Sequence, residues 1–166
     1  MTPSALPALV DEHYGAMHRL ARLAGKPAEA RAVVRAAWAR ALAQPGSPTR
    51  AQLLGHVLAE LDAPRPPAEG APAAPPHELE AEDGRWPGWW KDDLPATPDP
   101  EDEALDAAIG SLPPGLAVLL VLRDVEQLDA VEVEALLGHS PDAQLAFLQH
   151  GRSALRSALR ATEAAP

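Results

Sequence analysis

Apolar residues recur at helical spacing along the first third of the chain and predict three helices. Gly25 stops the first run, because glycine commonly ends a helix, and Pro27 opens the second run in its first turn. The third run begins near Ser47 or Thr49, either of which can cap a helix, and breaks at Pro64. In the second helix one apolar stripe is formed by Ala30, Val33, Val34, Ala37, Trp38, Ala41 and Leu42.

The last third of the chain predicts a further series of helices. A helix from Asp99 to about Ile109 is expected, because a capping aspartate, a proline and several acids match the preferences of a helix start. A Leu-Pro-Pro corner separates it from a helix that begins at Leu116. Two more helices follow, joined by a short turn that contains glycine.

This final helix pair has the pattern of a helix-turn-helix. Asp129 and Glu132 have the spacing of a capping box, and the helix that they open ends at Gly138. Ser140 and the proline after it open a longer helix that runs to roughly Ala161. Such a pair presents its second helix to the major groove of DNA.

Proline divides the chain, since ten of the 19 prolines lie between Pro64 and Pro100. No regular element survives that density, so we expect a linker over 63–98, stiffened by proline and extended by its carboxylates. The predicted organisation is a three-helix module over 1–62, a Pro-rich acidic linker that contains tryptophans, and a helix-turn-helix module over 99–166.

The composition favours an all-α fold. Hydrophobic residues make up 46% and aromatic residues only 4%, and alanine and leucine dominate the apolar share, which favours helices over strands. The lack of cysteine excludes disulfides, thiolate zinc sites and cysteine nucleophiles. The net charge of -10 is concentrated in residues 78–106, which carry 11 acids and 2 bases, so the flanking parts are close to neutral.

Patterns of catalysis and metal binding are missing from the sequence. It has no glycine-rich phosphate loop, nucleophile elbow or catalytic triad, and its six histidines form no zinc-type pair with a glutamate base. We therefore expect no enzyme activity, cofactor, metal or small-molecule substrate. No basic leader precedes an apolar run, and no run approaches the roughly 18 apolar residues of a membrane span. A cytoplasmic protein without membrane contact is expected.

An ordered set of markers runs through the last fifty or so residues: a Leu-Pro corner, a Leu-Arg-Asp segment, a Glu-Val helix, a Leu-Gly turn and an Arg-x-x-x-Arg tail. This order resembles the fourth conserved region of bacterial extracytoplasmic-function sigma factors. The segment DGRWPGWW is similar to a linker of one subgroup, and LVDEHYGAMHRLARLAGKPAEARAVVRAAWARAL resembles the second region more weakly. The resemblance implies RNA polymerase as partner and a DNA-binding helix-turn-helix. The markers are Leu112, Pro113, Leu122, Arg123, Asp124, Glu132, Val133, Leu137, Gly138, Ser140, Arg152 and Arg156.

Positions that carry function in that family hold other residues in this chain. The family's second region grips polymerase with a polar, acidic helix face; aligned on Trp38, those positions hold Arg31, Arg35 and two alanines. Arginines of the family's recognition helix align with Leu145 and His150. The resemblance therefore implies a polymerase-associated protein whose recognition of promoter DNA is weakened.

Four residues of the last helix are candidates for DNA contact. Gln144 has the side chain for an adenine contact, and Arg152, Arg156 and Arg160 are spaced to follow phosphates. An exposed glutamine and an ordinary solvated helix face would give the same pattern, so both interpretations stay open. Weak binding of duplex DNA with little sequence preference is expected of 107–166, because an acid and apolar residues accompany Gln144.

Trp86, Trp89 and Trp90 lie in the predicted linker, where three exposed indoles are unfavourable unless they dock on a surface. They could dock on the chain's own helices or anchor an acidic peptide in a groove of a partner. The nearest basic face in the chain is that of Arg31 and Arg35, and docking there would cover the side that holds polymerase in the family. These five residues are candidate partner-binding residues.

Two functions follow from the sequence. In the first, the chain is a sigma-factor-like transcription protein that binds core RNA polymerase and directs it to promoters with weakened DNA recognition. In the second, it is a sigma-derived regulator, such as a decoy or an anti-sigma-like module, that binds polymerase or another transcription regulator and no longer reads DNA. The family resemblance favours the first function, and the lost arginines favour the second.

Overall fold

The computed structural model describes residues 6–24, 27–62 and 102–163, and these ranges contain helices and connecting turns but no strand. The predicted all-α class is confirmed. The predicted linker over 63–98 lies outside the described residues. The elements are α1 (Leu6–Leu23), the 3₁₀ turn η1 (Pro27–Glu29), α2 (Ala30–Leu42), α3 (Arg50–Leu61), α4 (Asp102–Gly110), α5 (Pro114–Leu120), the π-helical turn η2 (Val121–Val125), α6 (Ala130–Leu137) and α7 (Pro141–Glu163).

The first three helices pack on one another around a core of aliphatic residues and the indole of Trp38. The capping of α3 explains where that helix begins. The Thr49 hydroxyl accepts a hydrogen bond from the Gln52 amide at 3.2 Å, and the Gln52 side-chain carbonyl accepts one from the Thr49 amide at 2.8 Å. This reciprocal pair satisfies two backbone donors that a helix start leaves unpaired.

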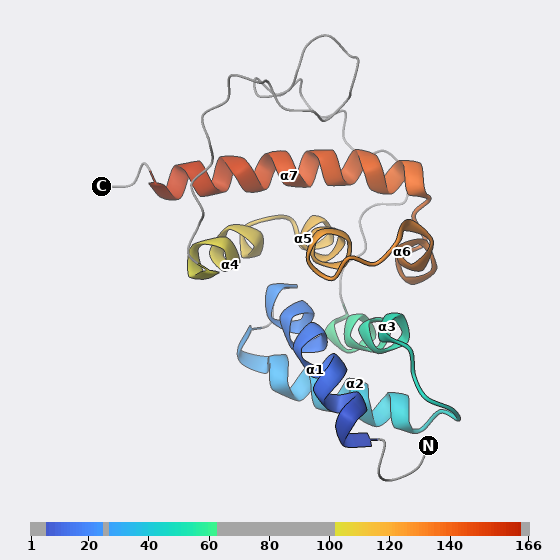
Figure 1. Cartoon of the computed structure of the whole chain (residues 1–166). Helices are drawn as coiled ribbons and strands as arrows, with labels where there is room; N and C mark the ends of the chain where they lie inside the picture. Colours follow the sequence, from blue (N-terminus) through green and yellow to red (C-terminus); the bar gives the residue numbers. More distant parts are fainter. Residues whose placement is uncertain (1–5, 25–26, 63–101, 164–166) are drawn as a thin grey trace.

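The C-terminal helices are arranged along α7, which runs the length of the molecule with α4, α5 and α6 in a row beneath it (Figure 1). A close approach brings α5 against α7 at Gly151. A Cβ atom there would lie 3.1 Å from the Cδ1 atom of Leu120. The absence of a side chain at Gly151 therefore lets the two helices pack tightly.

A π-helical turn, η2, ends the buried helix that begins as α5, and the sequence did not predict it. The Glu126 amide donates to the Val121 carbonyl at 2.8 Å, which is the wider π-type spacing. Gln127 follows with a positive φ of 54°, and the Leu128 amide returns to the Leu122 carbonyl at 3.0 Å. This turn leaves the Glu126 side chain fully buried.

The N-terminal and C-terminal helices are in contact. One continuous cluster of buried apolar side chains includes residues of α1–α3 and of α5–α7. A Cβ atom at Gly55 of α3 would lie 2.9 Å from the Cδ2 atom of Leu136 in α6, so these helices meet closely. The helices α1 and α3 therefore bury apolar surface against the C-terminal helices, and the division of the chain into two modules stays a prediction.

Candidate functional site

The helix-turn-helix predicted from the caps is present as α6, a tight turn and α7. The Asp129 carboxylate accepts from the Glu132 amide at 2.8 Å, and the Glu132 carboxylate accepts from the Asp129 amide at 3.0 Å. Gly138 ends α6 with a φ of 78°, in the left-handed region that favours glycine. The Ser140 hydroxyl then accepts from the amide of Ala143 at 3.3 Å and caps α7.

The structure places Gln144 inside this motif and not on its surface. The residue is 1% exposed, and its Nε2 group donates to the carbonyls of Ala130 and His139, each at 2.8 Å. Both N–H groups are therefore used to hold the start of α6 and the turn against α7. The interpretation of Gln144 as an adenine-contacting residue is corrected, since its side chain does not reach the surface.

The surface at the start of α7 is apolar and acidic. Val131 and Leu145 are exposed to 69% and 54%, and Asp142 is also exposed. From Asp124 to Gly151 the sequence contains six acidic residues and neither lysine nor arginine. Because DNA phosphates attract cations and repel carboxylates, this stretch of the chain is poorly suited to hold a duplex.

Arg152 is paired with an acid of the chain. Its Nε and Nη2 atoms donate to the two carboxylate oxygens of Asp124 at 2.8 and 2.6 Å. These hydrogen bonds raise the pKa of Arg152 above its ordinary value against the opposing effect of burial. A phosphate would have to compete with Asp124 for this guanidinium group.

Arg156 and Arg160 lie further along α7 and are both half-buried. Burial and, after it, the charge of Arg160 lower the pKa of Arg156, and the group still keeps its proton at neutral pH. The two cations are thus neighbours on one helix, as their spacing predicted. Their contact with phosphates stays a prediction.

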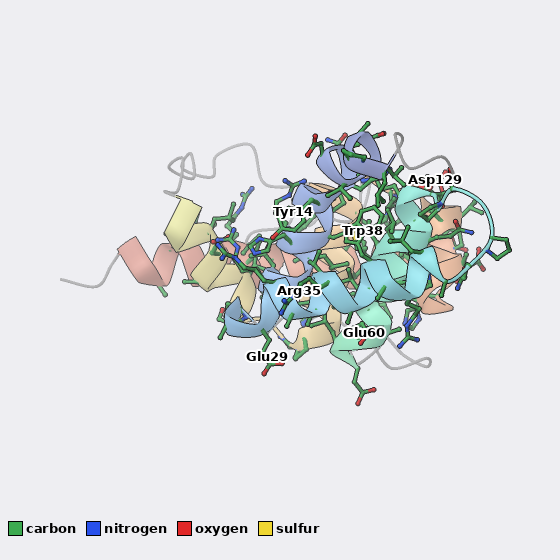
Figure 2. All side chains as sticks on the ribbon, turned by 90° about the horizontal axis from the view of Figure 1, so that it is seen from below. Tyr14, Glu29, Arg35, Trp38, Glu60 and Asp129 are labelled. Atoms are coloured by element: carbon green, nitrogen blue, oxygen red, sulfur yellow. The ribbon has the colours of Figure 1, made fainter. Side chains whose placement is uncertain are left out.

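Arg31 and Arg35 are exposed on α2, and neither forms an ion pair within the described ranges. Figure 2 shows Arg35 on α2, on the side of the molecule away from the C-terminal helices, with Tyr14 of α1 and Glu60 of α3 nearby in the view. The other described arginines of the N-terminal helices form the pairs Arg19–Glu126, Arg22–Asp106, Arg40–Glu60 and Arg50–Glu126. Trp86, Trp89 and Trp90 lie outside the described residues.

Sequence reasoning missed a buried carboxylate between the two groups of helices. Glu126 is fully buried and accepts hydrogen bonds from Arg19 of α1 at 2.8 and 3.2 Å and from Arg50 of α3. A second pair, Arg22–Asp106, joins α1 to α4 at 2.5 Å. Glu126 lies four positions beyond the apolar run over 116–122, so the sequence gives no clear signal that this acid is buried and requires a cationic partner. The residues near Glu126 in the sequence do not indicate which arginines are its partners.

The described residues contain no group of three or more side chains suited to hold a metal ion. Within the same ranges no helix is both long enough and apolar enough to cross a membrane. Comparison of the chain with protein-family models, curated proteins and solved structures found no match.

Proposed function

We propose that this chain is a sigma-factor-like transcription protein that works by contact with RNA polymerase or another transcription regulator, with promoter recognition weakened. The order of markers from Leu112 to Arg156 supports the sigma-like part of the proposal. The helix-turn-helix formed by α6 and α7 is compatible with it. The observation that carries the weakened recognition of DNA is the burial of Gln144, within a stretch from Asp124 to Gly151 that contains no lysine or arginine.

A second candidate function is a sigma-derived regulator that no longer reads DNA, such as a decoy or an anti-sigma-like module. Two observations favour it over an initiation factor. The guanidinium group of Arg152 is paired with Asp124, and the Glu126 contacts hold α1 and α3 against the C-terminal helices. In this arrangement the chain has less free surface for promoter DNA. This favours a function in which its exposed faces contact other proteins.

Reconstitution with purified core RNA polymerase tests both candidates. We expect the full chain to bind core polymerase in a fluorescence anisotropy titration and to direct little or no initiation from duplex templates. Binding with selective initiation would support an initiation factor. Binding without initiation would support the regulator. No binding to core polymerase, at concentrations where a known sigma factor saturates it, would overturn the association with polymerase.

The exposed arginines of α2 give this assay a matched pair of variants. Replacing Arg31 and Arg35 with alanine removes two cations that make no ion pair in the described part of the chain. Replacing Asp11 and Glu12 of α1, which are also exposed, changes charge elsewhere on the N-terminal helices. We expect the arginine variant to change the affinity for polymerase and the acid variant to leave it unchanged. Equal effects of both variants would argue against the α2 face.

A further inference from the structure

We propose that the outer face of the helix-turn-helix docks a basic amphipathic helix of another protein. This docking face consists of Val131 and Glu134 on α6 and of Asp142 and Leu145 on α7. The inference rests on the proposed function, because it names the chemistry of a partner for the same helix pair. It replaces contact with duplex DNA by contact with a protein at the surface where a recognition helix begins.

The apolar part of the docking face is open to solvent. Val131 is 69% exposed and Leu145 is 54% exposed, and they are the most exposed large apolar side chains of the described residues. The next in rank are Leu42, Val125 and Tyr14, at 43%, 40% and 39%. Neither Val131 nor Leu145 belongs to the buried core, so neither is needed to hold the fold. Large exposed aliphatic side chains that lie together mark contact surfaces.

The buried amide of Gln144 holds the start of α6, where Val131 lies, against the start of α7, where Leu145 lies. Its Nε2 atom lies 2.8 Å from the carbonyl oxygen of Ala130, the residue before Val131, while Leu145 directly follows Gln144. Figure 1 shows α6 directly beneath the N-terminal end of α7. The capping box of Asp129 and the Ser140 cap fix both helix starts. The docking face is therefore preformed, which lowers the entropic cost of binding.

The charge at the edge of the docking face selects the kind of partner. Glu134 and Asp142 are exposed, and neither forms an ion pair within the described ranges. The stretch from Asp124 to Gly151 contains no lysine or arginine, so neither acid has a cation beside it in the sequence. Apolar anchors flanked by carboxylates complement a helix with aliphatic residues on one face and lysine or arginine beside them. The same charge opposes the phosphates of a duplex.

A designed peptide can test this recognition on the full chain. The probe is a synthetic 18-residue helix of leucine and lysine with its leucines on one face. A peptide with the same composition in scrambled order is the control, because it keeps the charge and loses the amphipathic face. Binding is followed by fluorescence anisotropy and by methyl NMR shifts of Val131 and Leu145. We expect the ordered peptide to bind more tightly and to shift both methyl groups.

Two matched double variants locate the binding. Val131→Ser with Leu145→Ser removes the apolar anchors, while Leu42→Ser with Tyr14→Ser removes exposed apolar groups elsewhere. The Val131/Leu145 variant should raise the dissociation constant of the peptide by about tenfold or more, as expected when central anchors are lost. The Leu42/Tyr14 variant should raise it by less than twofold. Glu134→Lys should also weaken binding. All five substituted residues are exposed and lie outside the core, so these variants are expected to fold.

Three outcomes would overturn the proposal. The ordered and scrambled peptides could bind equally, which would indicate attraction to the acidic chain as a whole. The methyl groups of Val131 and Leu145 could respond to protein concentration alone, which would make a second copy the occupant. Duplex DNA could shift the same methyl groups, which would restore a DNA-reading surface. None of these results depends on polymerase, so failure here is distinguishable from failure of the proposed function.

Discussion

Arg19 of α1 and Glu126, which follows the η2 turn, are 107 positions apart in the sequence and form a two-point ion pair at 2.8 and 3.2 Å. Arg50 of α3 donates to the same carboxylate. The Glu126 side chain has no exposed area, whereas those of Arg19 and Arg50 are 46% and 40% exposed. The buried acid thus depends on both cations, and through them it joins the two groups of helices.

Removal of both cations should destabilise the protein strongly. In the variant Arg19→Met with Arg50→Met, the Glu126 carboxylate stays buried without a counter-charge, which costs about 3–5 kcal/mol in comparable buried pairs. Urea unfolding of the full chain measures this loss as a lower free energy of unfolding. The matched control is Arg31→Met with Arg35→Met, where exposed cations are lost and a change within about 0.5 kcal/mol is expected. Equal losses in the two variants would show that Glu126 does not need its partners.

The contact between α3 and α6 should be sensitive to side-chain size at Gly55. A Cβ atom there would lie 2.9 Å from the Cδ2 atom of Leu136, which is the end of a movable side chain. Gly55→Ala is therefore tolerated, while Gly55→Leu overpacks the contact and should lower stability by about 1–3 kcal/mol. Thermal unfolding followed by circular dichroism measures both. Gly110→Leu is the control, because nothing lies within 4 Å of a Cβ atom at that position. A Gly55→Leu protein as stable as this control would contradict the contact.

Gln144 should behave as a structural residue. Gln144→Met keeps the side-chain length but removes the donors to the carbonyls of Ala130 and His139, and leaving such buried groups unpaired costs about 1–3 kcal/mol. The exposed neighbour provides the control, since Leu145→Met should change stability by less than about 0.5 kcal/mol. If Gln144→Met instead left stability unchanged and weakened DNA binding, Gln144 would be a base-contacting residue after all.

The pairing of Arg152 with Asp124 limits attraction to DNA. Asp124→Asn replaces the charged acceptor with a neutral amide and frees the guanidinium group for phosphate. We expect tighter non-specific binding of duplex DNA and a salt dependence steeper by about 0.9 in the logarithmic slope, the contribution of one phosphate contact. Anisotropy titrations at several salt concentrations give this slope. Glu134→Gln is the control, because it removes the same charge at a site without a paired arginine. Its salt dependence of DNA binding should stay nearer that of the unchanged chain.

Local chemistry made much of the fold predictable from the sequence. The cap at Thr49, the capping box of Asp129 with Glu132 and the left-handed end at Gly138 all depend on residues no more than four positions apart. Such interactions can be recognised from short stretches of sequence. They predict the two helices and the turn of the helix-turn-helix without information on how these elements pack.

The contacts that join the two groups of helices could not be predicted in the same way. Glu126 finds its partners 76 and 107 positions away, and the π-helical turn that buries it has no sequence signature. The sequence predicts a surface position for Gln144, because a glutamine near a helix start is usually exposed. Its burial follows from two backbone carbonyls that only the folded turn brings within reach.

Selection from a pool of random duplex DNA by the full chain, at physiological salt, distinguishes a face of α6 and α7 that contacts protein from one that reads base sequence. With Gln144 buried and no lysine or arginine from Asp124 to Gly151, we expect weak retention and no enriched motif after repeated rounds. Tight retention of duplexes that share one sequence motif would contradict this expectation.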